Sequence, residues 1–244
     1  MQCRCRRWTR PTTTDAPLDK LPFSVYDFFG YLSAGFVLLV GLAAAFTGTE
    51  SWQRTPGATV GLLLVVVAYT AGHVIANVSG YLIEGTLVRT VLGTPSTVLF
   101  QERLSRWARL LPGYYRPLSP EQRQRVLSRA AEAGITGPGE GLFYHCFSAA
   151  KERESTMTRL STFLNLYGFC RNMAVSTFIV AIALFAGMLL GTAKTGQLVA
   201  PGWWAAGAFL ASIGLLYRYL KFFRHYSVEV FVSYAEPPTG QGTQ

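Results

Sequence analysis

Residues 58–84 of the chain are "ATVGLLLVVVAYTAGHVIANVSGYLIE", an apolar run that ends in a histidine, an asparagine and a glutamate. A helix needs about 20 apolar residues to cross the hydrocarbon core of a bilayer, and this run supplies them. We therefore interpret the segment from about Ala58 to about Tyr81 as a membrane-spanning helix. Its polar residues are the best functional lead, because polar groups within spans normally face a bundle interior or a water-filled cavity.

Three other runs have a similar length and composition, from about Val25 to Phe46, from about Met173 to Thr192, and from about Pro201 to Tyr219. The first run is not interpreted as a cleaved signal peptide, because the region before it is long and contains acidic residues. The four runs predict an all-α integral membrane protein with four transmembrane helices and a cytoplasmic helical segment between the second and third spans.

The composition supports this fold class. Half of the 244 residues are hydrophobic and 14% are charged, whereas a soluble domain has about 25% charged residues. The basic residues are mostly arginine, which we interpret as the codon bias of a GC-rich bacterial genome.

The distribution of lysine and arginine predicts the orientation. The N-terminal segment holds five of them, residues 82–172 hold twelve and the C-terminal tail holds three, whereas the two short connections hold only Arg54 and Lys194. Since positive charge is retained on the cytoplasmic side, we expect a multi-pass protein of the bacterial plasma membrane with both termini in the cytoplasm. The net charge of +9 is then explained by insertion and by anionic headgroups, and we expect no nucleic-acid partner.

These boundaries divide the chain into five parts. They are a disordered cytoplasmic N-terminus (1–22), a transmembrane hairpin of spans 1 and 2 (23–82), a cytoplasmic helical segment (83–171), a transmembrane hairpin of spans 3 and 4 (172–220), and a cytoplasmic tail (221–244).

Within the middle segment, "LFQERLSRWARLL" (99–111) has the spacing of a basic amphipathic helix. Its candidate functional residues are Arg103, Arg106, Trp107 and Arg109. One interpretation is a helix lying on the inner leaflet. The other is a docking surface for a partner or ligand.

Further helices are predicted by their end signals. Ser119 is a typical N-cap, Pro120 is a typical first helical residue, and Gly134 is a typical helix stop, so we predict a helix between them. From about Leu142 the pattern predicts one long helix that runs towards the third span. The tail "YSVEVFVSY" (226–234) follows the last span without a break, and we expect the helix to continue through it.

The polar residues of the second span are spaced to share one helical face. His73, Asn77 and Glu84, with Gly80 between the last two, are separated by 4, 3 and 4 positions. Residues at the inner ends of the first and third spans are expected at the same level. The candidate polar vestibule thus comprises Asp27, His73, Asn77, Glu84, Arg171 and Asn172.

Two interpretations of these residues remain open. They form interhelical hydrogen bonds and ion pairs that only hold the bundle together, or they line a vestibule for ions, protons or a small ligand. A shared metal is not expected, because His73 and Glu84 are about 16 Å apart along a helix axis. Small residues at Gly30, Gly35 and Gly72, among others, predict close helix approach within the chain or between protomers.

The sequence contains no phosphate-binding loop, nucleophile elbow, HExxH or paired CxxC motif. We therefore assign no catalytic residue and expect no metal or cofactor. The function expected is that of an oligomeric membrane anchor or effector in the lipid bilayer, a homo-oligomer whose cytoplasmic helices bind a protein partner. The alternatives are an ion channel with a polar inner vestibule and an intramembrane enzyme that acts on a lipid-like substrate.

Overall fold

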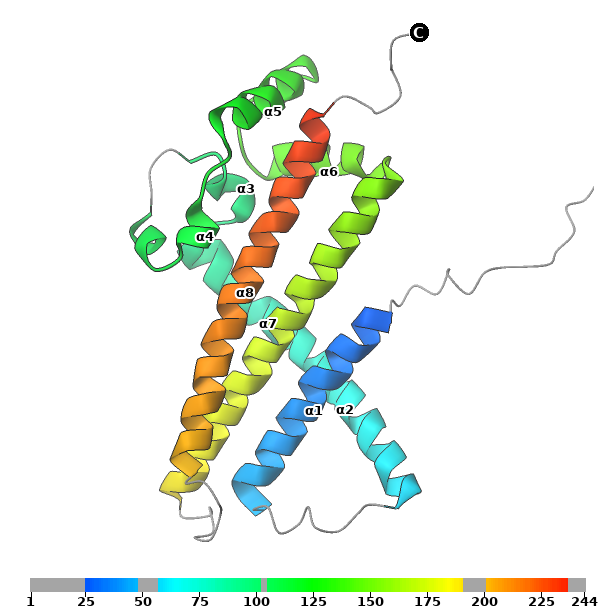
Figure 1. Ribbon diagram of the computed structural model, residues 1–244, viewed down its shortest axis with the longest axis vertical. Coiled ribbons are helices and arrows are strands. Elements are labelled where there is room, and N and C mark those ends of the chain that lie inside the picture. Colours follow the sequence, from blue (N-terminus) through cyan, green and yellow to red (C-terminus); the bar gives the residue numbers. More distant parts are fainter. Residues whose placement is uncertain (1–24, 48–56, 102–104, 191–200, 237–244) are drawn as a thin grey trace, which may run out of the picture.

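The structure, a computed structural model, describes residues 25–47, 57–101, 105–190 and 201–236 of the chain. Every element within these ranges is a helix, as Figure 1 shows. In chain order the helices are α1 (Val25–Thr47), α2 (Ala58–Ser79), η3 (Gly80–Leu92), α3 (Pro95–Val98), η4 (Arg106–Arg109), α4 (Pro112–Tyr115), α5 (Pro120–Glu132), α6 (Glu140–Lys151), α7 (Glu154–Leu189) and α8 (Pro201–Ala235).

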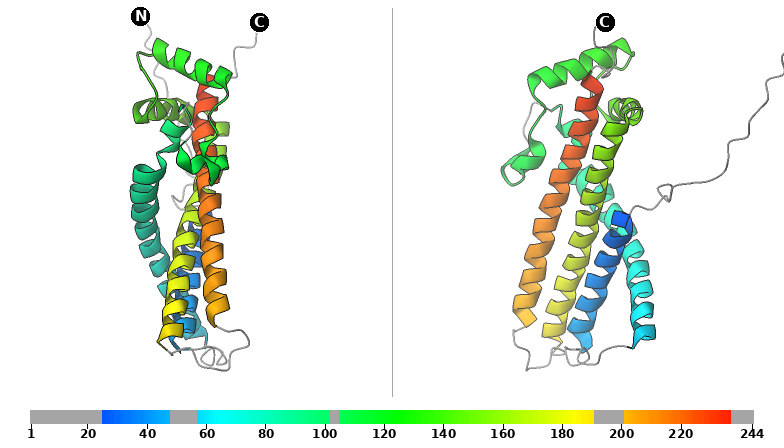
Figure 2. Two further views of the ribbon diagram at one scale, coloured as in Figure 1. Left: turned by 90° about the vertical axis from the view of Figure 1, so that its left-hand side faces the viewer. Right: turned by 45° about the vertical axis from the view of Figure 1, so that its right-hand side comes forward.

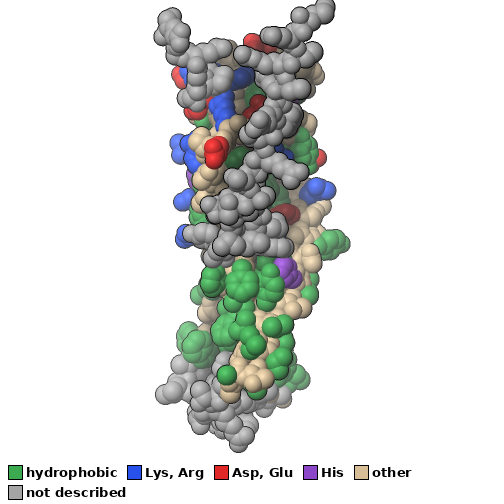
Figure 3. All heavy atoms as spheres, turned by 90° about the vertical axis from the view of Figure 1, so that its right-hand side faces the viewer, with side chains coloured by type: hydrophobic (Ala, Val, Ile, Leu, Met, Phe, Trp, Pro, Cys, Tyr) green, Lys and Arg blue, Asp and Glu red, His purple; other side chains and the backbone are tan. Residues whose placement is uncertain are grey.

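Three segments are long and apolar enough to cross a membrane, namely Phe28–Phe46, Ala58–Val98 and Glu154–Leu189. They contain the second predicted span and most of the first and third. The described part of α8 is not among them, because tryptophan, tyrosine and Arg218 interrupt its aliphatic residues. Figure 3 shows that hydrophobic side chains cover the lower part of the face in view and that charged side chains gather over the upper part.

Helices α7 and α8 lie side by side along their length and join the two halves of the molecule (Figures 1 and 2). They have 36 and 35 residues, so each is about 50 Å long, whereas the hydrocarbon core is about 30 Å thick. In the apolar half the Ser212 hydroxyl donates a hydrogen bond to the Ala174 carbonyl at 2.9 Å. In the charged half Arg159 pairs with Glu229 at 3.1 Å.

Helices α1 and α2 touch through two glycines. A Cβ atom on Gly35 would lie 1.8 Å from the Ala68 carbonyl oxygen, and one on Gly72 would lie 1.9 Å from that of Tyr31. Such distances are impossible for real atoms, so the backbones can meet only because neither residue has a side chain. The predicted close approach of small residues is confirmed at these two positions.

The second predicted span does not end near Tyr81. The helix continues as η3, a π-helix of 13 residues, to Leu92. Ser79, Ile83, Val88 and Leu92 are buried, and their spacing of 4, 5 and 4 follows the wider winding of a π-helix, whose hydrogen bonds join residues i and i+5. This winding keeps one apolar side against α7 and α8.

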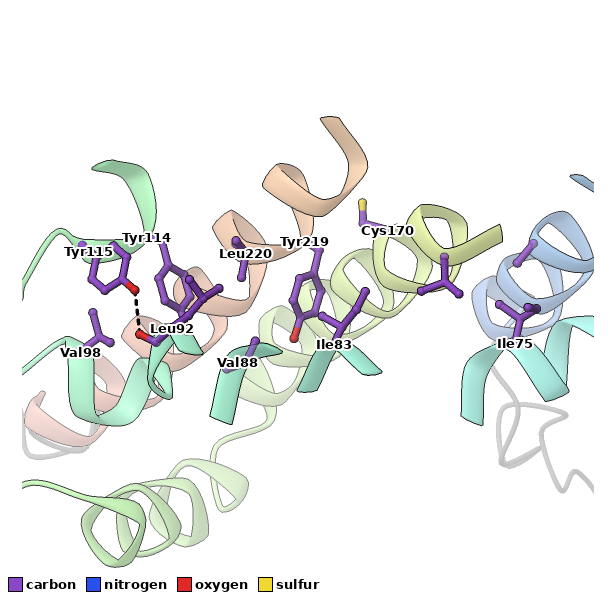
Figure 4. Close-up of a cluster of buried hydrophobic side chains, with 12 residues drawn as sticks. Ile75, Ile83, Val88, Leu92, Val98, Tyr114, Tyr115, Cys170, Tyr219 and Leu220 are labelled. Atoms are coloured by element: carbon purple, nitrogen blue, oxygen red, sulfur yellow. Dashed lines mark hydrogen bonds between the residues drawn. The ribbon is translucent and has the colours of Figure 1, made fainter. Parts of the chain in front are cut away.

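A core in the middle of the molecule forms where η3 meets α4, α7 and α8. Figure 4 shows Tyr219 of α8 beside Ile83 and Val88 of η3. The hydroxyl of Tyr115 donates a hydrogen bond to the Leu92 carbonyl at 2.8 Å, and that of Tyr114 donates one to the Gly93 carbonyl at 2.7 Å. The end of η3 is thereby tied to α4.

The charged end, which we call the head, consists of α3, α5, α6 and the adjoining ends of α7 and α8. It has its own buried core of Leu99, Phe100, Leu118, Val126, Ala130, Leu142, Cys146, Ala150, Leu160, Val230, Phe231 and Tyr234. Burial raises the pKa of the Cys146 thiol to about 12, so this cysteine is an inert packing residue.

Two arginines satisfy carbonyl groups at the end of α8, where the helix leaves them without intrahelical partners. Arg129 donates to the carbonyls of Tyr234 and Glu236 at 2.7 and 3.0 Å, and Arg153 donates to those of Ser233 and Glu236 at 2.7 and 2.8 Å. Positive charge is also favourable at a helix C-terminus. The head is thus attached to α8 by directed bonds as well as by packing.

The helix predicted over 120–133 is confirmed, and the Ser119 hydroxyl accepts from the Gln122 amide as expected of an N-cap. The helical continuation of α8 through Tyr234 is also confirmed. The prediction of a single long helix from Leu142 is wrong, because the helix is interrupted at Glu152 and Arg153, between α6 and α7.

The amphipathic helix predicted over 99–111 is not found. The chain there forms the short 3₁₀ turn η4, and residues 102–104 lie outside the described ranges. Phe100 is buried against Phe231, with ring centroids 5.0 Å apart, while Trp107 packs into the middle core. These two aromatic residues are held by different cores, which a single straight helix would not allow.

The expected part boundaries at 82/83, 171/172 and 220/221 fall inside η3, α7 and α8. The expected N-terminal part (1–22), the two short connections with Arg54 and Lys194, and the last eight residues lie outside the described ranges.

We predict that Gly72→Ala destabilises the protein by about 1–3 kcal/mol, because the added methyl group forces α1 away from α2. Gly61→Ala is the matched control, since a Cβ at Gly61 of the same helix meets nothing within 4 Å. It should be neutral or stabilising by up to about 1 kcal/mol. Thermal unfolding of both variants in detergent measures the difference, and equal melting temperatures would contradict the glycine contact.

Candidate functional site

The polar residues at the junction between the apolar half and the head form a clamp between two helices. Arg171 of α7 donates to the Glu84 carboxylate of η3 at 2.5 Å. The Arg171 side chain is 17% exposed and that of Glu84 is 36% exposed. A carboxylate and a guanidinium in this partly buried position neutralise each other, which removes the cost of leaving either one alone.

A second bond lies beside this ion pair. The Ser79 hydroxyl donates to Asn172 Oδ1 at 2.7 Å, and both side chains are buried. Asn172 Oδ1 also accepts from Arg171 Nε at 3.4 Å. The four residues Ser79, Glu84, Arg171 and Asn172 therefore make one connected set, which we call the polar clamp.

Two buried hydroxyls near this level have no hydrogen-bond partner in the described structure. They are those of Ser176 in α7 and Tyr219 in α8. Figure 4 shows the Tyr219 hydroxyl directed towards η3. Buried hydroxyls without partners are uncommon and cost free energy. The hydroxyls around the clamp therefore have fewer hydrogen bonds than the clamp residues themselves.

The structure does not bring His73 and Asn77 to the clamp. The His73 ring stacks on Tyr31 of α1, with centroids 4.3 Å apart, and meets Tyr69 edge-on at 4.6 Å. Asn77 is exposed on the outer side of α2. The change to π-winding at Gly80 turns Glu84 towards α7, so the residues that an ideal α-helix would align point in different directions.

Two predicted site residues, Asp27 and Arg103, fall partly or wholly outside the described part of the chain. Residue 27 belongs to α1, but the side chain of Asp27 lies outside what the structure describes, and so does Arg103 entirely. Sequence reasoning identified Glu84, Arg171 and Asn172 and missed Ser79. The sequence offered one signal for Ser79, its position next to Gly80 in the polar stripe. Its partner Asn172 could not be predicted, because it depends on how α2 and α7 pack.

Arg106 and Arg109 of η4 are exposed and line a cavity of about 770 Å³ near α4. Arg116 also lines this cavity and was missed, since it lies beyond the predicted helix. A second cavity of about 830 Å³ lies in the head against α5, lined by Gln101, Pro117, Leu118, Pro120, Arg123, Gln124, Leu127 and Ser128. Neither cavity is lined by residues of the polar clamp.

Among the described residues, no group of three histidine, cysteine or acidic side chains is arranged to hold a metal ion. Comparison of the chain with models of protein families, with curated proteins and with solved structures finds no match.

We predict that the ion pair of the clamp is coupled by about 0.5–3 kcal/mol. Arg171→Gln alone should destabilise more than the double variant Glu84→Gln/Arg171→Gln, because it leaves a carboxylate without its partner. Unfolding free energies of the wild type, both single variants and the double variant give the coupling. Strict additivity of the two single variants would show that the contact contributes nothing.

The two asparagines should respond differently to the same substitution. Asn172→Leu removes the acceptor of the Ser79 hydroxyl and should cost about 1–2 kcal/mol, the upper range for an interhelical bond in a membrane. Asn77→Leu should be neutral or stabilising, since Asn77 lies on the exposed outer side of α2. Melting temperatures in detergent measure both, and a larger loss for Asn77→Leu would be inconsistent with these positions.

Proposed function

We infer that the protein is a membrane anchor that presents a helical head to a cytoplasmic protein partner. The observation that carries this proposal is the continuity of α7 and α8, which leave the apolar half and become part of the head without a break. A head built on such helices has a fixed position relative to the bilayer. This is the property needed to hold a partner at the membrane surface.

In this proposal α8 is the fourth transmembrane helix. It packs along α7, and its outward apolar residues, including Trp203, Leu210 and Ile213, are exposed in the isolated chain. Lipid would cover them. The excess of lysine and arginine outside the two short connections supports a cytoplasmic head, because positive charge is retained on that side during insertion.

The polar clamp has a structural role in this proposal. Its charges neutralise each other and its buried amide is bonded, so α2–η3 and α7 are fixed at the level where the chain leaves the bilayer. A vestibule that binds ions would instead require Glu84 and Arg171 to be free of one another. The channel and the lipid-modifying enzyme remain the alternatives, and homo-oligomerisation remains a proposal that accompanies the anchor.

The partner is proposed to bind the cavity against α5. Its lining combines apolar side chains such as Leu118 and Leu127 with the amides of Gln101 and Gln124. Protein partners typically anchor themselves by placing a few large side chains in such pockets. The cavity belongs to the head, which in this proposal lies in the cytoplasm, so a cytoplasmic protein can reach it.

We predict that a photoreactive phenylalanine analogue placed at Gln124 forms one discrete adduct with another protein in living bacteria. The matched control is the same analogue at Tyr144, an exposed position on α6 of the head, which should form none. Gel shift and mass spectrometry of the adducts give the readout.

Three outcomes would contradict the proposal. One is the absence of any adduct at Gln124, and another is an adduct with a second copy of the chain alone. The third is ion flux from liposomes that contain the purified wild-type protein, together with the loss of this flux in the Glu84→Gln variant. That result would establish the channel.

A further inference from the structure

A positively charged groove lies where η4 and α4 approach α8. The cavity of about 770 Å³ is lined by Ser105, Arg106, Ala108, Arg109, Pro112, Tyr115, Arg116 and Pro117. We call it the arginine groove, after Arg106, Arg109 and Arg116. In the described chain none of these three arginines pairs with a carboxylate, and no acidic residue lines the cavity. A concave surface with charge of one sign concentrates ions of the opposite sign.

Helix α8 adds further positive charge. The Arg224 guanidinium donates two hydrogen bonds to the Arg116 carbonyl, at 3.0 and 2.8 Å. Burial, and then the charge of Arg116, lowers the pKa of Arg224. Burial, followed by the charges of Arg224 and Lys221, also lowers the pKa of His225. Neighbouring cations are thus the second cause of both shifts, after burial.

The arginine groove lies next to the end of the apolar stretch of α8. A Cβ on Gly113 of α4 would be 3.2 Å from the Tyr217 hydroxyl, and Tyr217 is at the inner end of the predicted fourth span. Leu110, which follows Arg109, is 69% exposed. An exposed leucine beside exposed arginines is the pattern of a segment at a bilayer surface, where apolar side chains enter the acyl region and cations meet the phosphates.

We propose that the arginine groove binds the phosphate of an anionic phospholipid headgroup. Arg106, Arg109 and Arg116 would donate charge-assisted hydrogen bonds to the phosphate oxygens, for which the forked guanidinium is well suited. Leu110 would enter the acyl region beside the bound lipid. The assignment rests on the proposed membrane placement, but it is independent of the protein partner and of the cavity against α5.

The test uses the full chain in detergent, titrated with phosphatidylglycerol or phosphatidylcholine and read by native mass spectrometry. The wild type should bind phosphatidylglycerol saturably and should show no such binding of phosphatidylcholine. Arg106→Gln/Arg109→Gln should weaken phosphatidylglycerol binding by roughly 10- to 30-fold, because each basic residue near an anionic surface contributes about a five-fold factor.

The matched control is Arg125→Gln/Lys151→Gln, which removes the same charge from α5 and α6 of the head and should change binding by less than about two-fold. An equal loss in both double variants would show attraction by net charge and overturn the site. Saturable binding of inorganic phosphate or glycerol phosphate, with equal affinity and in competition with the lipid, would overturn the lipid as its source. Equal binding of both lipids would overturn it as well, whereas failure of the membrane placement would appear separately as a protein that does not insert into liposomes.

Discussion

The packing of α7 against α8 is the interaction on which the rest of the structure depends. The two helices are each longer than the bilayer is thick, so one continuous interface is apolar at one end and aromatic and charged at the other. At the junction Tyr167 of α7 contacts Tyr219 and Phe223 of α8. Among the described helices, α1 and α2 pack on the lower half of this pair, η3 crosses its middle, and the head surrounds its upper end.

The polar clamp pairs opposite charges at the level where the helices leave the apolar half. A lone Glu84 or Arg171 would be costly there, but the pair is neutral as a unit. Ser79 and Asn172 add a bond between the same two segments. Because these groups bond to one another, they hold the helices together at this level. Three arginines that pair with no carboxylate in the described chain, Arg106, Arg109 and Arg116, lie instead around the arginine groove.

Features set by local sequence were predictable. The start of α2, the extent of α1 and the Ser119 cap of α5 follow from composition and end signals within a few residues. Features set by distant contacts were not. The 99–111 segment has helical spacing, but Phe100 and Trp107 are held by two separate cores. The polar stripe was predicted on an ideal α-helix, and the π-winding after Ser79, stabilised by α4, α7 and α8, separated Glu84 from His73 and Asn77.

In the described residues, α8 passes from the apolar half into the head without a flexible linker, which has a consequence for the proposed recruitment of a partner. From Tyr219 to Ala235, α8 is one uninterrupted helix, which corresponds to a height of about 24 Å at 1.5 Å per residue. If Tyr219 marks the bilayer surface, a docked protein is held at that fixed stand-off and in one orientation. The docked protein can then meet other proteins only within a thin layer above the membrane. The length of α8 therefore determines which neighbouring membrane proteins the docked protein can reach.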